Sequence, residues 1–230
     1  MQTSSRTITS SQQGPHQDLV RRVQRARESE WRRPPAEHTR DAFDVAAKWL
    51  ADQNRPLILD AGCGVGLSTR RLAERHPEHA VMGVDRSEQR LSRDHGALPD
   101  NALLVRADLV DFWRLAMAAE WRPARHYLLY PNPYPKSTQL KKRWQGHPVF
   151  PTILALGGQL ELRSNWAIYV QEFALGVKTL RNLEGEITPF VPEVASTTSS
   201  EPTFLTPFER KYFESGQTLW RYRVDLTPLD

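Results

Sequence analysis

Hydrophobic and polar residues follow two alternating patterns from residue 57 toward the C-terminus. Short apolar runs, typical of buried strands, alternate with longer segments in which apolar residues recur every three or four positions, as on one face of a helix. The apolar runs predict strands at 57–61, 80–84, 102–106, 126–130 and 159–163. The longer segments predict helices at 67–76, 87–95, 109–119, 139–156 and 166–181.

This alternation predicts an α/β fold with a Rossmann-like, doubly wound and mostly parallel sheet whose crossovers are right-handed. Two late strands, near 186–190 and 219–226, are expected to form an antiparallel hairpin at the edge of the sheet, which gives it a C-terminal antiparallel strand. Residues 192–202, between these strands, are rich in Ser, Thr, Glu and Pro, a composition that predicts a mobile loop.

The chain before the first strand has a different composition. Residues 1–17 are rich in Ser, Thr and Gln, which predicts a flexible segment. Residues 18–30 predict a charged helix that ends before Pro34, and residues 39–51 predict a second helix with one apolar face. A chain of 230 residues is long enough for one well-buried α/β domain. The predicted organisation is a flexible basic N-terminal segment, 1–38, and one domain, 39–230.

A glycine-rich turn follows the first predicted strand, in the sequence Gly62-Cys63-Gly64-Val65-Gly66. Glycine tolerates positive φ and lacks the Cβ that would block a ligand, and the N–H groups of the turn and the next helix can meet the polar end of a nucleotide-like cofactor. The spacing differs from the Gly-x-Gly-x-x-Gly of dinucleotide enzymes. A tight turn without a ligand is the alternative, but the strand before it and the helix after it favour a cofactor site.

Aspartates stand at the ends of three successive strands of the predicted sheet. In an open α/β sheet the ligand lies beyond the carboxyl ends of the strands. There Asp60 is placed to steady the glycine turn or the amino-acid part of a cofactor, Asp85 to accept from ribose hydroxyls and Asp108 to accept from an adenine amino group. A single aspartate in such a place is also a common helix N-cap, so three in succession strengthen the cofactor hypothesis.

A proline-rich loop follows the fourth strand, in the sequence Tyr130-Pro131-Asn132-Pro133-Tyr134-Pro135-Lys136. Prolines stiffen such a loop, which would hold Asn132 and Tyr134 in a fixed pose beside the cofactor. Cations next to an aromatic ring suit a nucleic-acid backbone and a splayed base. The residues concerned are Lys136, Lys141, Lys142, Arg143 and Trp144. The alternative is a turn followed by a solvated basic helix.

Composition adds limits on partners and compartment. The net charge is +4, and basic residues gather near the N-terminus, where they provide a second candidate surface for phosphate contacts. These residues are Arg21, Arg22, Arg25, Arg27, Arg32 and Arg33. Cys63 is the single cysteine, so no intrachain disulfide forms. With no apolar run of membrane-spanning length and no secretory signal, the expected location is the cytoplasm.

Motifs in these segments carry a resemblance to a known family. The glycine turn with its strand-end acids resembles motif I of the class I S-adenosylmethionine methyltransferases. Three further segments resemble the bacterial tRNA guanine-N7 methyltransferases, collinearly from about residue 55 to the C-terminus. They are the loop 131–136, which resembles Pro-Asp-Pro-Trp-Pro-Lys, the segment 163–166, which resembles Ala-Thr-Asp-Trp, and the segment 206–210, which resembles Thr-x-Phe-Glu-Arg.

The resemblance implies a cofactor, a substrate and a set of site residues. The cofactor would be S-adenosyl-L-methionine, held by Asp60, Gly62, Gly64, Gly66, Asp85, Asp108 and Asn132. The substrate guanosine of a tRNA would contact Lys136, Asn165, Thr206 and Glu209. Asn132 stands at the family's catalytic aspartate, and Asn165 also replaces a carboxylate. No metal and no membrane are expected, and the protein would be a monomer or a weak homodimer.

These two amides keep other functions open. One alternative is a divergent S-adenosylmethionine methyltransferase that acts on another RNA or on a small molecule. Another is a catalytically silent RNA-binding paralogue that retains the fold. The order Pro-Asn-Pro-Tyr also echoes the Asn-Pro-Pro-Tyr of enzymes that methylate amino groups on bases, but Thr206-Pro207-Phe208-Glu209 has no place in that family.

Overall fold

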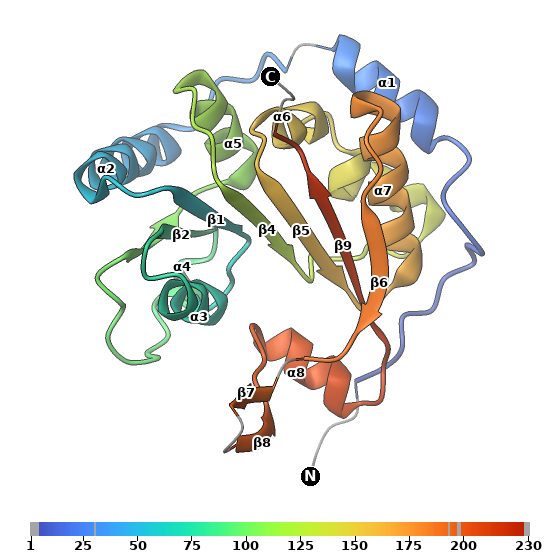
Figure 1. The fold of residues 1–230 in the computed structure, drawn as a ribbon. Helices are drawn as coiled ribbons and strands as arrows, with labels where there is room; N and C mark the ends of the chain where they lie inside the picture. The colour runs from blue at the N-terminus through green and yellow to red at the C-terminus, as the bar shows by residue number, and fades with distance from the viewer. Residues whose placement is uncertain (1–4, 30, 193, 197–198, 228–230) are drawn as a thin grey trace.

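The computed structural model describes residues 5–227 except 30, 193, 197 and 198. Its centre is a seven-stranded sheet in the order β3-β2-β1-β4-β5-β9-β6 (Figure 1). The strands are β1 (Leu57–Ala61), β2 (Ala80–Asp85), β3 (Ala102–Arg106), β4 (Arg125–Leu129), β5 (Gln159–Ser164), β6 (Glu186–Phe190) and β9 (Leu219–Asp225). Strand β9 runs antiparallel to both of its neighbours, and the other pairs are parallel. The predicted fold class is confirmed.

Helices cover both faces of the sheet at its central strands, which are buried on both sides (Figure 1). The helices are α1 (Leu19–Glu28), α2 (Glu37–Gln53), α3 (Leu67–Arg75), α4 (Glu88–Leu91), α5 (Leu109–Ala118), α6 (Phe150–Ala155), α7 (Ala167–Arg181) and α8 (Pro207–Glu214), with two 3₁₀ turns, η1 (Ser137–Lys142) and η2 (Trp144–Gly146). Side chains alternate between the faces of a strand. Leu57 and Leu59 of β1 therefore join the core under α5, α6 and α7, whereas Ile58 joins the core under α3.

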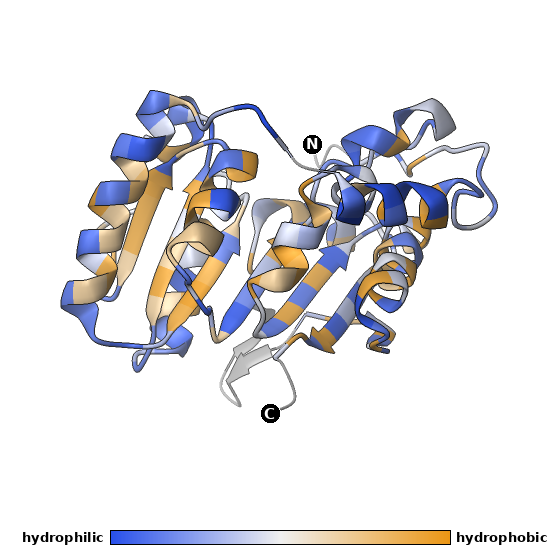
Figure 2. Ribbon diagram, turned by 90° about the horizontal axis from the view of Figure 1, so that it is seen from above, coloured by the Kyte–Doolittle hydropathy of each residue, from blue (hydrophilic) through white to orange (hydrophobic). Residues whose placement is uncertain are grey.

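The central strands are the most continuously hydrophobic part of the molecule (Figure 2). Every residue of β1 and β2 is buried. Buried parallel strands of this kind end together at one edge of the sheet, so the segments that follow β1, β2, β3 and β4 are brought side by side. Among the helices of the described residues, none combines the length and hydrophobicity that would span a bilayer.

Two predicted helices are wrong in extent. The expected helix 139–156 is divided into η1, η2 and α6, because Pro148 disfavours helical geometry at His147, which has a ψ of 145°. Arg143 is also extended, with a ψ of 146°. The expected helix 87–95 ends at Leu91, because the Asp-His-Gly sequence that follows favours a turn.

The C-terminal third departs further from the prediction. Strands β6 and β9 pair antiparallel at the edge of the sheet, as predicted. The outermost strand is β6, and β7 (Val194–Ser196), β8 (Ser199–Pro202) and α8 lie in the connection, so the pair is not a simple hairpin. The predicted loop 192–202 contains the two-stranded pair of β7 and β8, while 193, 197 and 198 lie outside the described residues. A polar segment has no alternating hydrophobic pattern, so no strand was predicted there.

The N-terminal segment lies against the domain. Leu19 and Val23 of α1 are fully buried in the same core as the sheet and α7, and residues before α1 follow the surface toward α8 (Figure 1). There the N–H of Ser5 donates to Ser215 Oγ at 2.9 Å. The division of the chain at residue 38 stays a prediction.

Candidate functional site

A cavity of about 520 Å³ lies at the carboxyl ends of β1, β2 and β4. Its volume falls in the range of roughly 300–1,000 Å³ that is usual for cofactor sites. Six of the predicted site residues line it: Gly62, Gly64, Asp85, Asp108, Asn132 and Thr206. Five lie outside its described lining: Asp60, Gly66, Lys136, Asn165 and Glu209. Their assignment to cofactor or substrate stays a prediction.

The glycine turn forms one wall of the cavity. Gly64 has a φ of 60°, and a Cβ built on it would meet nothing within 4 Å, so its backbone is open to the cavity. Gly66 serves packing instead, because a Cβ there would come within 2.8 Å of the Leu104 side chain. The turn is anchored at its start, where Gly62 N donates to Val84 O at 2.8 Å. The backbone of β1 is thus fixed to β2 at the point where the cavity begins.

Asp85 connects the glycine turn to the loop after β2. One carboxylate oxygen accepts from Gly64 N at 3.0 Å and the other from Ser87 N at 2.8 Å. The side chain lines the cavity although the residue is only 5% exposed. Each carboxylate oxygen has a further lone pair. Asp85 is therefore held rigidly and can still accept from the hydroxyl groups of a ribose.

Asp60 is buried beneath the turn. Its Oδ2 accepts from the hydroxyls of Ser68 and Thr69 in α3, at 2.6 and 2.7 Å. Its Oδ1 has no hydrogen-bond partner in the part of the chain that the structure describes. Burial raises the pKa of Asp60 to about 6, although the two hydroxyls act in the opposite direction. This aspartate fixes the start of α3 to β1, which supports the turn from below.

Asp108 caps α5. Its Oδ1 accepts from Val110 N at 2.9 Å and more weakly from Asp111 N at 3.4 Å. This is the N-cap role that the sequence left open as an alternative. The residue also lines the cavity, so capping and ligand contact are compatible at this position.

The proline-rich loop forms the opposite wall, and we call residues 131–136 the lip. Tyr130 and Tyr134 flank its centre with φ values of 53° and 43°. Bulky residues adopt such left-handed geometry only where the surroundings hold them there, and such strain gathers at functional sites. Between them, the exposed Asn132 faces the cavity, and its Oδ1 accepts from Tyr134 N at 3.3 Å.

The predicted substrate residues separate into different environments. Thr206 lines the cavity and caps α8, since its hydroxyl accepts from Glu209 N at 3.0 Å. Glu209 is fully buried and forms an ion pair with Arg163 at 2.5 Å. Asn165 donates to Gln217 Oε1 at 2.8 Å, while Lys136 is exposed at the end of the lip. Only Thr206 therefore meets the cavity directly.

Sequence reasoning missed several residues in the lining. Four are cations or potential cations near the loop after β2: Arg86, Arg90, Arg93 and His95. Two are aromatic, Tyr169 and Phe208. The three arginines could have been found from the sequence, because they follow closely after Asp85. Phe208 could also have been found, because it lies in the segment 206–210 that resembles a family motif. Tyr169 lies on α7, and nothing in the sequence around it indicates that it lines the cavity.

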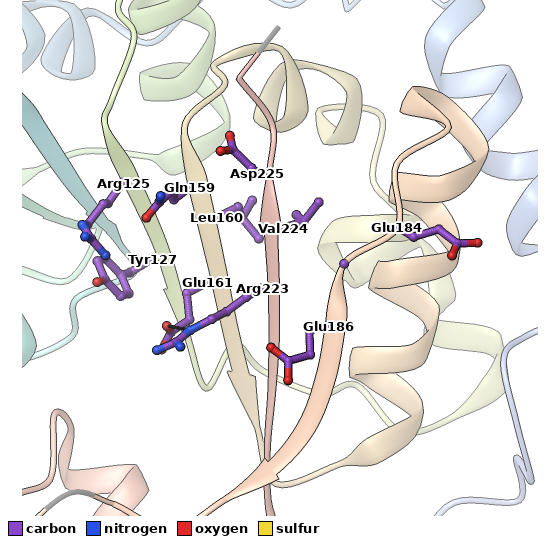
Figure 3. Close-up of a pocket in the computed structure, with 11 residues that line it drawn as sticks. Arg125, Tyr127, Gln159, Leu160, Glu161, Glu184, Glu186, Arg223, Val224 and Asp225 are labelled. Atoms are coloured by element: carbon purple, nitrogen blue, oxygen red, sulfur yellow. Dashed lines mark hydrogen bonds and ion pairs between the residues drawn. The ribbon is translucent and has the colours of Figure 1, made fainter. Parts of the chain in front are cut away.

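A second cavity, of about 410 Å³, lies on the sheet face over β4, β5, β9 and β6 (Figure 3). None of the predicted site residues lines it. Glu161 occupies its middle and accepts from Arg163 and Arg223, both at 2.6 Å. Although burial raises the pKa of Glu161, these two arginines outweigh it and lower the pKa below its usual value. The charges at the centre of this hollow are thus already paired within the protein.

Known proteins resemble this chain in sequence. Residues 54–222 match a family described as "Putative methyltransferase". A tRNA (guanine-N(7)-)-methyltransferase from Bordetella pertussis is 27% identical over 187 residues, which cover 77% of this chain and 69% of that protein. A trans-aconitate 2-methyltransferase from Escherichia coli O1:K1 is 33% identical over 105 residues, but the match covers only 42% of this chain and 40% of that relative.

Solved structures share the fold. The 16S rRNA methyltransferase KamB superposes with a TM-score of 0.54 at 17% identity, over 80% of this chain and 94% of that one. An antibiotic-related methyltransferase superposes with a TM-score of 0.53 at 12% identity, with the same coverage. At these identities the similarity concerns the fold, which is the methyltransferase fold expected from the sequence.

Proposed function

Because the chain belongs to this methyltransferase family, as a divergent member similar to the tRNA guanine-N7 enzymes, we propose that it methylates N7 of a guanine in tRNA. The cofactor predicted from the sequence, S-adenosyl-L-methionine, is that of a methyltransferase of this fold. The observation that carries the proposal is the meeting of the glycine turn, Asp85 and the asparagine of the lip around one cavity.

The residues present fit this cofactor. Gly64 leaves its side of the cavity free of side-chain atoms, and Asp85 offers two held carboxylate oxygens to a ribose. Leu109 and Tyr130 add apolar surface to the lining. Such a mixture of apolar walls and a few fixed polar groups is typical of nucleotide-like ligands.

The bound cofactor supplies an electrophilic methyl group on a sulfonium. Guanine N7 carries a free lone pair, so no residue of this chain has to remove a proton before transfer. The work of the protein is to align the acceptor and to stabilise developing charge. Asn132 lies on the lip with Tyr134, where its amide oxygen can face a guanine and the ring can stack on the base.

The lip has less negative charge to stabilise a cationic base than it would have with the carboxylate of the related enzymes at this position. A guanine methylated at N7 is cationic, and a carboxylate would stabilise it more than the amide of Asn132 does. Among the lining residues, Arg86, Arg90, Arg93 and Lys142 add positive charge. These cations suit the phosphates of a nucleic acid and support an RNA acceptor over a neutral small molecule.

A basic hollow of about 250 Å³ beside the lip supports RNA binding. Residues of α1, of the segment just before it and of η1 form it together: His16, Asp18, Arg21, Arg22, Arg25, Ser137, Thr138, Leu140 and Lys141. Asp18 is its one acid and pairs with Arg21 at 2.9 Å. Arg21, Arg22 and Arg25 of the N-terminal basic cluster and Lys141 of the second cluster thus share one surface, which fits a phosphate backbone.

The test is methyl incorporation from labelled S-adenosylmethionine into unmodified tRNA, with the methylated nucleoside identified by mass spectrometry. We expect 7-methylguanosine. Methylation of another RNA or of a small molecule would support the alternative of a divergent methyltransferase with a different acceptor. Binding of tRNA and cofactor without any methylation would favour the silent paralogue. Asn132 and Asn165, which replace carboxylates of the family, are the residues that keep this alternative open.

A further inference from the structure

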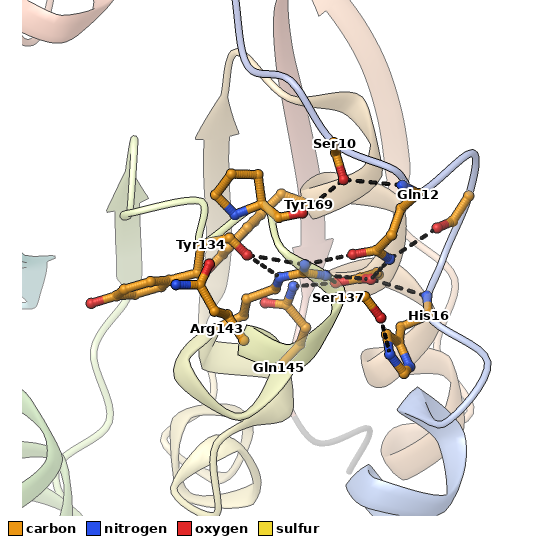
Figure 4. A network of polar contacts seen from close by, with 12 residues as sticks. Ser10, Gln12, His16, Tyr134, Ser137, Arg143, Gln145 and Tyr169 are labelled. Carbon is orange, nitrogen blue, oxygen red and sulfur yellow. Dashed lines mark hydrogen bonds and ion pairs between the residues drawn. The ribbon is translucent and has the colours of Figure 1, made fainter.

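Arg143 is not the phosphate-binding cation that its sequence position suggests. Its side chain is fully buried, and its Nη1 donates to both carboxylate oxygens of Glu172 in α7 at 2.7 Å (Figure 4). The same guanidinium reaches the lip, where Nε and Nη2 donate to Tyr134 O at 3.1 and 3.0 Å. Nη2 also donates to Lys136 O at 3.3 Å. A single buried cation therefore connects α7 to the lip.

Residues 10–16, which we call the strap, close this network from the outside. Gln12 Oε1 accepts from Arg143 Nη2 at 2.6 Å, and Gln12 Nε2 donates to Glu172 at 3.1 Å. His16 contributes its backbone N–H, which donates to Glu172 at 3.0 Å, and its ring, which lies 2.8 Å from Ser137 Oγ.

The strap also touches the lip directly. Ser10 Oγ donates to Pro135 O at 2.7 Å (Figure 4). Together with Arg143, this hydrogen bond fixes the two successive backbone carbonyls of Tyr134 and Pro135. The strap lies more than a hundred residues from the lip in sequence, so only the folded chain brings them together.

The lip needs such support. Tyr134 has a φ of 43°, a conformation that a bulky residue leaves unless neighbouring groups hold it. Its carbonyl is held by the two Arg143 donors and its N–H by Asn132 Oδ1, at 3.3 Å. If the carbonyl were released, Tyr134 would relax, and the hydrogen bond that orients the Asn132 side chain would be lost with it.

We propose that the strap acts through Glu172 and Arg143 as a clamp that holds Asn132 and Tyr134 in the geometry for methyl transfer. Glu172 and Arg143 are positioning residues, since Arg143 holds the lip, Glu172 holds Arg143, and neither lines the cavity. The inference rests on the proposed function for its catalytic consequence, but the mechanical link between strap and lip is independent of which acceptor is used.

The test separates the inner residues of the strap from their exposed neighbours. Gln12→Ala removes the side-chain contacts to Glu172 and Arg143, and His16→Ala removes the ring contact to Ser137 but leaves the backbone N–H of His16 on Glu172. Gln13→Ala and Gln17→Ala change exposed neighbouring side chains. We expect the double variant at 12 and 16 to lower kcat by roughly 10- to 100-fold, because small misplacements have effects of that size. The dissociation constant for S-adenosylhomocysteine should stay within about twofold, as the glycine turn is untouched.

A second readout does not depend on catalysis. Hydrogen exchange at the amides of 132, 134 and 136–140 should become faster in the 12 and 16 double variant and remain unchanged in the 13 and 17 control. Arg143→Lys keeps a cation beside Glu172 but cannot reach all its partners at once, so it should accelerate exchange in the lip while the fold is retained.

Each result decides the proposal. Equal exchange and equal kcat in the double variant and its control would overturn the clamp. So would a rise in KM for tRNA with unchanged kcat, because that pattern marks a binding residue. If the wild-type protein methylates no RNA, the proposed function fails, and the exchange experiment alone then decides whether the strap holds the lip.

Discussion

The carboxylate of Asp85, at the end of β2, accepts a hydrogen bond from the backbone N–H of Gly64 at 3.0 Å. One acid thus orders the turn after a neighbouring strand while its remaining lone pairs face the cavity. A cofactor that binds here meets a surface already arranged by protein–protein hydrogen bonds.

Asp85→Ala should weaken cofactor binding strongly. It removes two hydrogen bonds to a charged acceptor and any contact to ribose, so we expect the dissociation constant for S-adenosylhomocysteine to rise at least about tenfold, which is about 1.4 kcal/mol. Calorimetry measures it, and Asp100→Ala, an exposed acid, is the control. Unchanged affinity in Asp85→Ala, or binding of a nicotinamide dinucleotide in place of this cofactor, would contradict the assignment.

The raised pKa of Asp60 should make the free energy of unfolding depend on pH. Burial raises its pKa from 3.8 to about 6, so the folded protein holds this proton more tightly than the unfolded chain does. The resulting stabilisation is complete below about pH 4 and is lost as the pH rises through 6, with a size on the order of 3 kcal/mol.

Denaturant unfolding of the wild type and Asp60→Asn between pH 4 and 7 tests this. Because Asn does not titrate, the free energy of unfolding of the wild type should fall relative to that of the variant over this interval. Parallel pH curves for the two proteins would show that the Asp60 carboxyl titrates near its ordinary pKa.

Asn132→Asp should preserve or raise the rate if the acceptor is guanine N7. The new carboxylate would lie beside a base that becomes cationic, and a gain of up to about tenfold in kcat corresponds to about 1.4 kcal/mol of transition-state stabilisation. The measurement is single-turnover methylation of unmodified tRNA, with the exposed Asn54→Asp as control. A lower rate in Asn132→Asp together with 7-methylguanosine in the wild type would refute this electrostatic account.

Glu209→Ala should act on stability more than on substrate binding. Glu209 is fully buried, pairs with Arg163 and also accepts from Leu205 N at 2.5 Å. Burial lowers the pKa of Arg163, but its two glutamate partners outweigh this and raise it, so the guanidinium stays charged. Removal of one partner of such a pair costs about 3–5 kcal/mol. Thermal unfolding compares this variant with Glu214→Ala on the exposed side of α8, for which about 0.5 kcal/mol or less is expected.

Lys141→Ala should weaken tRNA binding and reduce its salt dependence. Lys141 lines the basic hollow with Arg21 and Arg25. Each lost phosphate contact lowers the slope of log affinity against log salt by about one. Filter binding at several salt concentrations gives this slope, and Lys178→Ala, which lies outside the hollow and pairs with Glu184, should leave it unchanged. Salt-insensitive binding in the wild type would argue against a phosphate surface.

The sequence alone determined the features that depend on local chemistry. The strand positions follow from short apolar runs, and the turn at Gly62–Gly66 follows from residues that adopt positive φ without strain. Parallel strands end at one edge, so the meeting of Asp85, Asp108 and Asn132 was predictable once the fold class was known. The motifs also predicted the family correctly.

Only the tertiary structure decided which polar side chains are buried. Nothing near Arg143 or Glu209 in sequence distinguishes them from exposed charges, yet each is enclosed by a partner far along the chain, Glu172 in one case and Arg163 in the other. The same holds for the strap, whose contact with the lip spans more than a hundred residues. A charge can be buried only where an oppositely charged partner lies beside it in good geometry, because desolvation of an unpaired charge is costly. Only the folded chain brings such distant partners together.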